Sequence, residues 1–404
     1  MTTRDIFHWH SAARLFAELD EVFRRDARAL DVFTEICATN TSDALAQLIR
    51  ILGTGQSFCL YEKEPPDGFT APKTGEFLTL TGGTSGRPKA VRRTQASWVA
   101  SFDVNAHLFR LTSDDTIAVF GRLSHSLALY GLLEGLHLGL DVQVLAELSP
   151  GKQHAALLAK KTTVLYATPT QLRLLARGQV APLVDVRLIL CGGGLLDGAT
   201  EKQLSVLCPR ADLRVFYGAA ETSFIALSDN NTPQGSVGRA YPGVTFELRG
   251  PDGEIWVQSP YLFEGYASGE SRDTKCNDGF VSIGELGQRD SRGNLTIKGR
   301  KSRIVQIADQ NVHLEEVEKV LIELPEIPTC AVIAQPDMSR GQKLVAVLEG
   351  PTDTKLVTKV RQHCRYRLNA LMTPKSVFFI AELPLLPSGK TDLISLAKWV
   401  EHQT

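Results

Sequence analysis

Between residues 77 and 230, short apolar runs alternate with stretches of helical periodicity, and this alternation restricts the fold more than any other feature. After a first run at Phe77–Thr81, the runs are "DTIAVFG", "DVQVLAE", "TTVLYAT", "VRLILCGG" and "LRVFYG". Apolar strands that are separated by helices predict a parallel sheet with helices covering it. We therefore expect an α/β fold whose binding residues lie beyond the carboxyl ends of the strands.

The rest of the chain predicts two further sections and two N-terminal helices. Beyond residue 235, short alternating strands and turns at "PDGE" and Arg292–Gly293 predict an antiparallel, barrel-like section. From about residue 303, helices and strands alternate over a length typical of one small α+β domain. The spacing of apolar residues predicts a helix over Phe7–Phe23, and a second, capped helix that ends near Gly53 before a strand. We expect a large N-terminal domain, 1–299, with a mostly parallel, helix-covered sheet and a small barrel-like section, then a small α+β C-terminal domain, 300–404.

Composition excludes several classes of partner. The 44 basic and 45 acidic residues give a net charge of -1, which does not favour a nucleic acid or an acidic membrane. No run reaches the ~18 apolar residues of a membrane span, and the N-terminus has no apolar core of a signal peptide. The seven cysteines include no C-x-x-C pair, which predicts reduced thiols and a cytoplasmic location.

The stretch "TGGTSGRPKAVRRT", from Thr81 to Thr94, is the strongest candidate for a binding loop. Glycines expose backbone amides, hydroxyls add donors and a lysine adds charge, so the loop suits a polyphosphate. It does not match the P-loop pattern, because Gly86 is followed by Arg87-Pro88-Lys89 and no Ser or Thr follows the lysine. This mismatch argues against a P-loop kinase or ATPase. By itself, such a loop is as often a simple turn.

Seven segments, in order, resemble the signatures of the adenylate-forming superfamily, which includes acyl- and aryl-CoA synthetases, luciferases and peptide-synthetase adenylation domains. The first is "TGGTSGRPKAV", which resembles the phosphate loop. The others are "LILCGGGLL", "FYGAAETS", "GSVGRAYPGV", "DGFVSIGELGQRDSRGNLTIKGRKSRIV", "QNVHLEEVE" and "ELPLLPSGKTD". The resemblance runs from about residue 77 to 393 and implies ATP, Mg²⁺, a small carboxylic acid and a mobile C-terminal domain.

The resemblance assigns a role to each matching residue. The residues that match those around the β- and γ-phosphates of ATP are Thr81, Gly82, Gly83, Thr84, Ser85, Gly86 and Lys89. Those that match the adenine pocket are Gly192, Gly193, Gly194, Tyr217 and Gly218. Outside the family, Tyr217 would be read as an ordinary core aromatic at a strand end.

Five further residues match the family's charged or hinge positions. Glu221 matches the acidic residue that holds Mg²⁺, a role suited to a carboxylate oxygen; otherwise it would be a helix N-terminal partner. Glu285 and Arg300 match the ribose contacts, and Ser302 lies at the hinge. Lys390 matches the catalytic lysine of the C-terminal domain, which neutralises charge on the α-phosphate. Without the family, Arg300 and Lys390 would be solvated charges.

His125 stands where amino-acid-activating members carry an aspartate that holds the substrate's amino group. With no carboxylate at this position, an ammonium would be poorly neutralised, so a fatty or aromatic acid is the expected substrate. The alternative is a structural histidine.

Several positions depart from the family pattern. Glu285 replaces an aspartate, Ala220 replaces a common threonine, and Ser302 replaces Asp or Lys at the hinge. Ala308 and Asp309 replace two glycines of a loop that, in the family, lines the pantetheine tunnel, so this departure is expected to affect thioester formation more than adenylation. The phosphate loop also begins early, at residue 81, which resembles short stand-alone ligases of biosynthetic clusters.

The sequence therefore predicts activation of an aryl or fatty acid as an acyl-adenylate, with release of pyrophosphate. Transfer to a pantetheine thiol would follow, either on CoA or on the phosphopantetheine of an acyl carrier protein. The alternative is a non-catalytic or adenylation-only member that kept the fold.

Overall fold

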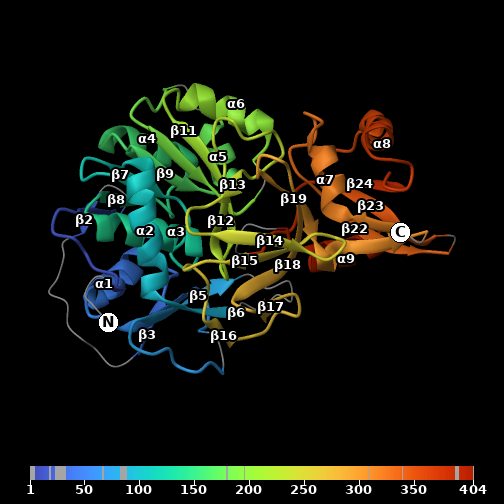
Figure 1. The fold of residues 1–404 in the computed structure, drawn as a ribbon. Helices are drawn as coiled ribbons and strands as arrows, with labels where there is room; N and C mark the ends of the chain where they lie inside the picture. The colour runs from blue at the N-terminus through green and yellow to red at the C-terminus, as the bar shows by residue number, and fades with distance from the viewer. Residues whose placement is uncertain are drawn as a thin grey trace.

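The largest sheet forms the centre of the N-terminal part of the protein (Figure 1). A computed structural model describes residues 5–17, 20–22, 33–65, 68–81, 89–178, 181–194, 196–308, 310–338, 340–386 and 391–403. The sheet has nine strands in the order β13-β12-β11-β10-β9-β7-β8-β1-β2. Their bounds are β1 Leu15–Ala17, β2 Asp20–Val22, β7 Thr116–Val119, β8 Asp141–Val144, β9 Val164–Ala167, β10 Leu188–Cys191, β11 Asp212–Ala219, β12 Ser223–Leu227 and β13 Arg239–Ala240. Strands from β11 to β1 run parallel, and the edge strands are antiparallel.

Helices bury both faces of this sheet, as the sequence predicted. They are α2 Gln95–Phe109, α3 Ser126–Leu138, α4 Pro150–Lys160, α5 Pro169–Ala176 and α6 Gly198–Leu207. On β7, Ile117 and Val119 belong to the core cluster under α2 and α3, whereas Ala118, with Phe120 just after the strand, belongs to the cluster under α4, α5 and α6. Alternate side chains of a strand point to opposite faces, so apolar residues are needed on both faces.

A second, five-stranded sheet carries the start of the candidate phosphate loop. Its order is β16-β6-β5-β4-β3. Its strands are β3 Phe33–Cys37, β4 Ser57–Tyr61, β5 Glu76–Thr81, β6 Lys89–Thr94 and β16 Gly265–Ser268, with helix α1 at Thr41–Ile51. The predicted helix that ends near Gly53, and the strand after it, are confirmed.

The helix predicted at the N-terminus is wrong. Residues 11–14 form a turn and an extended segment, and β1 and β2 follow. Leu15 pairs with Val142 in parallel, and both Leu15 and Phe16 are buried. Pairing with a strand more than a hundred residues away outweighs the local pattern of apolar spacing.

The barrel-like section is an antiparallel sheet of β14 Thr245–Arg249, β15 Glu254–Gln258, β17 Lys275–Asn277, β18 Phe280–Arg289 and β19 Leu295–Arg300. The predicted turns at "PDGE" and Arg292–Gly293 join β14 to β15 and β18 to β19.

The C-terminal part has its own apolar core and lies to one side of the rest (Figure 1). It contains η2 Lys301–Arg303, β20 Ile304–Ile307, β21 Gln310–His313, α7 Leu314–Ile322, β22 Cys330–Asp337, β23 Gly341–Glu349, α8 Thr354–Arg367, β24 Ser376–Ile380 and α9 Leu393–Glu401. The α/β fold with a small α+β C-terminal part is confirmed. The predicted boundary between Gly299 and Arg300 coincides with the end of β19, and the division itself stays a prediction.

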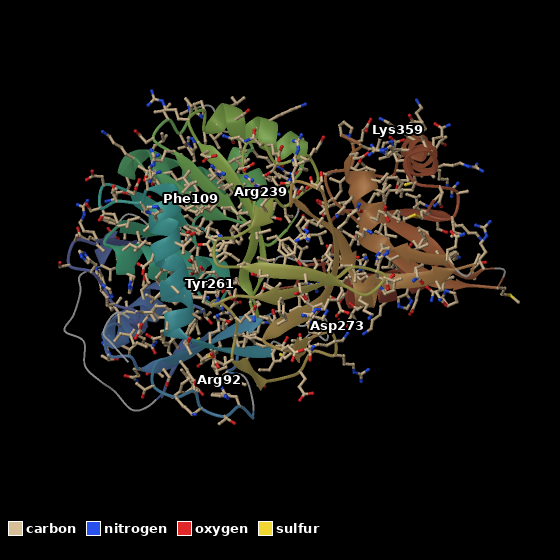
Figure 2. The ribbon with its side chains drawn as sticks, viewed as in Figure 1. Arg92, Phe109, Arg239, Tyr261, Asp273 and Lys359 are labelled. Atoms are coloured by element: carbon tan, nitrogen blue, oxygen red, sulfur yellow. The ribbon has the colours of Figure 1, made fainter. Side chains whose placement is uncertain are left out.

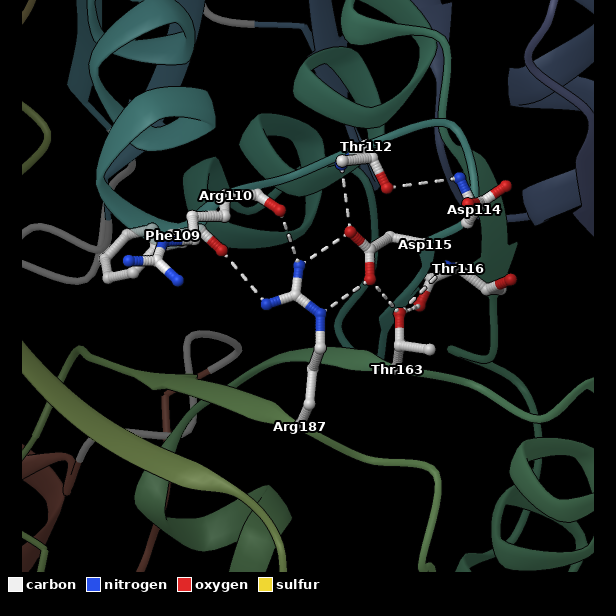
Figure 3. Close-up of polar contacts among 8 residues, drawn as sticks. All are labelled: Phe109, Arg110, Thr112, Asp114, Asp115, Thr116, Thr163 and Arg187. Atoms are coloured by element: carbon white, nitrogen blue, oxygen red, sulfur yellow. Dashed lines mark hydrogen bonds and ion pairs between the residues drawn. The ribbon is translucent and has the colours of Figure 1, made fainter.

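A cluster of hydrogen-bonded polar side chains connects the amino ends of three parallel strands (Figure 3). Asp115, Thr163 and Arg187 directly precede β7, β9 and β10. Arg187 donates to both Asp115 oxygens, at 2.8 and 2.6 Å, and Thr163 Oγ1 donates to Asp115 Oδ1 at 2.8 Å. Arg187 also donates to the carbonyls of Phe109 and Arg110, where α2 ends. This cluster lies at the end of the sheet opposite the candidate site.

No helix in the described segments combines the length and the apolar character needed to cross a bilayer. All seven cysteines lie within the described ranges, and none is in a disulfide.

Candidate functional site

The two ends of the candidate phosphate loop lie side by side. Thr81, the last residue of β5, pairs in antiparallel register with Lys89, the first residue of β6. The five residues Gly82, Gly83, Thr84, Ser85 and Gly86 lie outside the described part of the chain. Lys89 Nζ lies 5.8 Å from the centre of the Tyr266 ring, a cation–π distance.

Glu221 lies on a hairpin turn between β11 and β12, and not at a helix start as its alternative interpretation assumed. The Tyr266 hydroxyl donates to Glu221 Oε1 at 2.8 Å and also contacts Thr274 Oγ1 at 2.8 Å. The Phe263 amide donates to the Glu221 carbonyl at 2.9 Å. Burial, and then the Glu221 charge, raise the pKa of the Tyr266 hydroxyl, so it remains a donor to the carboxylate at neutral pH.

The donors present fit Mg²⁺ held jointly with ATP. In the described ranges, no three His, Cys, Asp or Glu side chains are grouped to enclose a metal ion. Mg²⁺ commonly uses one or two protein carboxylates together with water and substrate phosphates. Tyr266 donates to one oxygen of Glu221, Oε1, and among the described residues no hydrogen-bond donor contacts the other, Oε2. Glu221 is therefore the residue that would hold Mg²⁺, and the metal would neutralise phosphate charge there.

The two predicted ribose residues and the predicted adenine-stacking residue meet. Glu285 on β18 and Arg300 on β19 are paired residues of one antiparallel ladder, and Arg300 Nε donates to Glu285 Oε1 at 3.2 Å. The Tyr217 hydroxyl, from the central sheet, donates to Glu285 Oε2. Glu285 is 9% exposed. The Glu285 carboxylate therefore contacts residues of both sheets.

The predicted adenine glycines adjoin this group at the ends of β10 and β11. A Cβ on Gly192 would lie 2.1 Å from the Phe216 ring, so only glycine fits under that aromatic residue. A Cβ on Gly218 would lie 1.9 Å from the Ser223 carbonyl oxygen, across the hairpin that carries Glu221. Gly193 has a φ of +85°, and both Gly193 and Gly194 are exposed. Glycine at these positions lets the backbone turn tightly and remain open to a ligand.

His125 lies beside the start of the phosphate loop. It bridges Leu80, the residue before Thr81, and directly precedes α3. A carboxylate lies next to it after all: His125 Nε2 is 3.5 Å from Glu62 Oε1. Glu62 also accepts from Arg122 Nη1 at 3.0 Å and from Ser124 Oγ at 2.7 Å. Because Arg122 already neutralises the Glu62 charge, this carboxylate does not require the ammonium group of an amino-acid substrate as a partner.

Of the predicted hinge and C-terminal residues, the structure describes Ser302 and Ala308. Ser302 is exposed in the single turn η2, next to Arg300. Ala308 has a φ of +46°, in the left-handed region that favours glycine. Asp309 and Lys390 lie outside the described residues.

Two residues of this site were not predicted from the sequence, Glu62 and Tyr266. Glu62 follows β4, in a segment with no family motif, and its contacts bridge 60 or more residues of sequence. Tyr266 follows Gly265 in "FEGYAS", and the pairing of β16 with β6 brings it beside Lys89. Two surface cavities, of about 270 and 230 Å³, lie elsewhere, near Arg14 and Trp9, and no predicted site residue lines either of them.

Comparison with known proteins identifies the family. A model of the AMP-binding enzyme family matches residues 22–267, and a model of the AMP-binding enzyme C-terminal domain matches residues 316–390. The chain belongs to the AMP-binding enzymes. Members of this family use ATP, so ATP is the expected nucleotide.

Individual relatives agree with this assignment. The chain is 32% identical over 343 residues to an uncharacterized acyl–CoA ligase of Bacillus subtilis, covering 82% of this chain and 70% of that protein. It is 28% identical over 371 residues to a salicyl-AMP ligase/salicyl-S-ArCP synthetase of Mycobacterium tuberculosis, covering 86% of this chain and 63% of that protein.

A solved structure supports the fold. An amide bond synthetase from Marinactinospora thermotolerans matches with a TM-score of 0.72 at 23% identity, over 91% of this chain and 80% of that chain. At this identity the likeness concerns the fold alone. The predicted fold class, family and enzyme class, an AMP-forming acyl or aryl ligase, are confirmed.

Proposed function

We propose that this protein activates an aryl or fatty acid with ATP and then transfers the acyl group to a pantetheine thiol. In the first step a carboxylate oxygen attacks the α-phosphorus of ATP. The bond from that phosphorus to the oxygen bridging the β-phosphorus breaks, and pyrophosphate leaves. In the second step the thiol sulfur attacks the acyl carbon, AMP leaves and the thiol proton is released.

One observation carries the proposal. Tyr217, Glu285 and Arg300, which the family pattern assigns to the adenosine part of ATP, come from two sheets and form one hydrogen-bonded group. Tyr217 lies near the carboxyl end of β11, where parallel sheets bind their ligands, and its hydroxyl contacts Glu285 of the antiparallel sheet, which in turn contacts Arg300.

Each site residue would contact a different part of the substrates. Tyr217 would stack on adenine, while Glu285 and Arg300 would contact the ribose. Lys89 and the loop from Thr81 to Gly86 would hold the β- and γ-phosphates, and Glu221 would hold Mg²⁺ beside them. His125 would face the carboxylic acid. Lys390 would neutralise the charge that grows on the α-phosphate, so positioning and electrostatics would supply most of the rate.

The acceptor thiol is the finer part of the proposal. One relative is named as a CoA ligase, and another as a synthetase that loads a carrier, denoted ArCP. We therefore propose CoA or the phosphopantetheine of an acyl carrier protein as the acceptor. We propose the cytoplasm as the place of this reaction, because the sequence has seven cysteines and no C-x-x-C pair.

Changing Lys390 tests the first step. We expect Lys390→Ala to abolish formation of the acyl-adenylate while ATP still binds, because the lysine would act mainly on the transition state. The adenylate is trapped with hydroxylamine as the hydroxamate, and ATP binding is measured by calorimetry. The neighbouring Lys398→Ala, on α9, is the control. Unchanged hydroxamate formation in Lys390→Ala would remove this residue from the mechanism.

The acceptor is tested separately. The wild-type enzyme, ATP and an accepted acid are incubated with CoA or with a phosphopantetheinylated carrier protein, and the thioester is detected by mass spectrometry. A thioester on either thiol supports the second step. Adenylate without thioester on both thiols would leave an adenylation-only enzyme.

A further inference from the structure

Arg93 is the largest fully buried side chain among the described residues, and it lies directly behind the Glu221 turn. It is 0% exposed. An arginine is almost never fully buried unless it is paired, because removing its charge from water costs several kcal/mol. Yet in the described part of the chain no carboxylate lies within ion-pair distance of Arg93.

The hydrogen bonds of Arg93 all go to neutral acceptors around Glu221. Nη1 donates to the carbonyl of Ala220, the residue before Glu221. Nη2 donates to Ser223 Oγ at 2.6 Å and to the carbonyl of Tyr261. The two terminal nitrogens of the Arg93 guanidinium, here called the Arg93 fork, therefore bind the turn on both sides of Glu221. They also join the turn to the segment that leads into β16.

The turn is one that needs such support. Ser223 has a φ of +54°, in the left-handed region that is unfavourable for a residue other than glycine. Its hydroxyl is the group that Arg93 binds. The Phe263 amide and the Tyr266 hydroxyl hold the Glu221 carbonyl and carboxylate from the same segment.

The charge of Arg93 also acts on Glu221. Burial lowers the pKa of Arg93 to about 10, and the Glu221 charge is the largest opposing influence, followed by Glu264. Arg93 therefore remains charged at neutral pH. Glu264 is exposed, whereas Glu221 is half-buried. Solvent and salt therefore screen the attraction between Arg93 and Glu221 less than the attraction between Arg93 and Glu264.

We propose that Arg93 is a positioning residue for Glu221. It fixes the Ala220–Ser223 turn so that Glu221 Oε2 faces the nucleotide phosphates, and it thereby sets the affinity for Mg–ATP. This inference rests on the proposed function of Glu221 as the Mg²⁺ residue.

The chain provides a matched control on the same strand. Arg92 is adjacent to Arg93, but it faces the other side of β6, where it donates to the Thr70 carbonyl at 3.3 Å and lies 4.0 Å from Glu76. In Figure 2, Arg92 lies near the lower edge of the molecule and Tyr261 lies in its interior. Arg92→Met removes the same charge from the same strand and leaves the turn intact.

The test compares binding of a non-hydrolysable ATP analogue with and without Mg²⁺, by calorimetry. For Arg93→Met, we expect the gain in affinity caused by Mg²⁺ to fall about tenfold or more, while metal-free binding changes less than threefold. Arg92→Met should match the wild type within twofold. Arg93→Met with the wild-type gain would overturn the proposal.

Two further variants keep the outcome interpretable. If Arg93→Met does not fold, as judged by its thermal melting, Ser223→Ala removes one contact of the fork and should lower the Mg²⁺ gain about threefold; an unchanged gain also overturns the proposal. Glu221→Gln tests the premise. If Glu221→Gln keeps the wild-type gain, the metal role of Glu221 fails; if only Glu221→Gln loses it, the role of Arg93 fails.

Discussion

Two arginines differ in how the protein accommodates their charge: Arg187, which precedes β10 of the central sheet, and Arg93, on β6 of the second sheet. Arg187, at the amino ends of the strands, is bidentate to Asp115, and its side chain is 37% exposed. Arg93, beside the Glu221 turn, is fully buried and has only neutral acceptors. The Asp115 hydrogen bond raises the pKa of Arg187, whereas burial lowers that of Arg93.

The difference indicates what each end of the sheet is for. Burial would raise the pKa of Asp115, but hydrogen bonds from Arg187, Thr112 and Thr163 outweigh it and lower the pKa. A charge that is fully paired in this way serves the fold. A buried arginine without an ion pair costs stability, and its contacts converge on a candidate ligand residue. We infer that charges at the amino ends stabilise the sheet and charges at the carboxyl ends serve the site.

The largest expected effect on stability comes from the pH dependence of Glu134. This carboxyl group is buried and, among its described hydrogen-bond partners, has no cation. Burial raises its pKa to about 7, against hydrogen bonds from Tyr166 and Asn105. Below pH ~4.5 it is protonated both folded and unfolded. As the pH rises to about 7, only the unfolded chain releases the proton, so stability falls, by about 3 kcal/mol in total.

The comparison of wild type with Glu134→Gln isolates this effect. The urea midpoint of the wild type should fall relative to that of Glu134→Gln between pH 5 and pH 8. Other titrating groups are common to both proteins, including His137, whose burial lowers its pKa to about 4. A constant difference across this pH range would show that folding does not raise the pKa of Glu134.

Breaking the paired arginine should affect stability and spare the site. Arg187→Met leaves the Asp115 carboxylate buried, and we expect it to cost about 2–3 kcal/mol, since Arg187 is over a third exposed and breaking a deeper pair costs about 3–5 kcal/mol. The KM for ATP should stay within twofold at a temperature where the variant is folded. Arg239→Met, at an exposed pair with Asp229, should cost under about 1 kcal/mol. A large rise in the KM for ATP of Arg187→Met, with little loss of stability, would contradict the view that Arg187 stabilises the fold and does not serve the site.

The smallest effect concerns the C-terminal part. Ala308 adopts a left-handed φ of +46°, so Ala308→Gly should raise stability by up to about 1 kcal/mol. If the loop lines the pantetheine tunnel, the same change should alter thioester transfer more than adenylation. Thermal melting and the two half-reaction rates measure both effects, and an equal change in the two rates would contradict the proposed role of this loop.

Much of the fold could be predicted because the signal is local. The buried parallel strands are continuous apolar runs, and the turns of the antiparallel section carry glycine. The order of the family motifs then places Glu221, Tyr217 and Glu285 at one end of the sheet. Strand β1 was missed because its partner, β8, lies more than a hundred residues away.

The supporting contacts of the site could not be predicted, for the same reason. Glu62 reaches Arg122 and Ser124, and Arg93 reaches Ala220 and Tyr261, across 60 to 168 residues. In the sequence, Arg93 is one of two adjacent arginines in "AVRRT", and only the direction in which each side chain leaves β6 distinguishes them.

The central claim is that this protein joins a carboxylic acid to AMP. Its most direct test is pyrophosphate release from ATP and Mg²⁺, with no thiol present, across a panel of aryl and fatty acids. We predict release that depends on one class of acid, with the acyl-adenylate as the second product. ATP binding without acid-dependent pyrophosphate from any member of the panel would contradict the claim and favour a protein that kept the fold without the reaction.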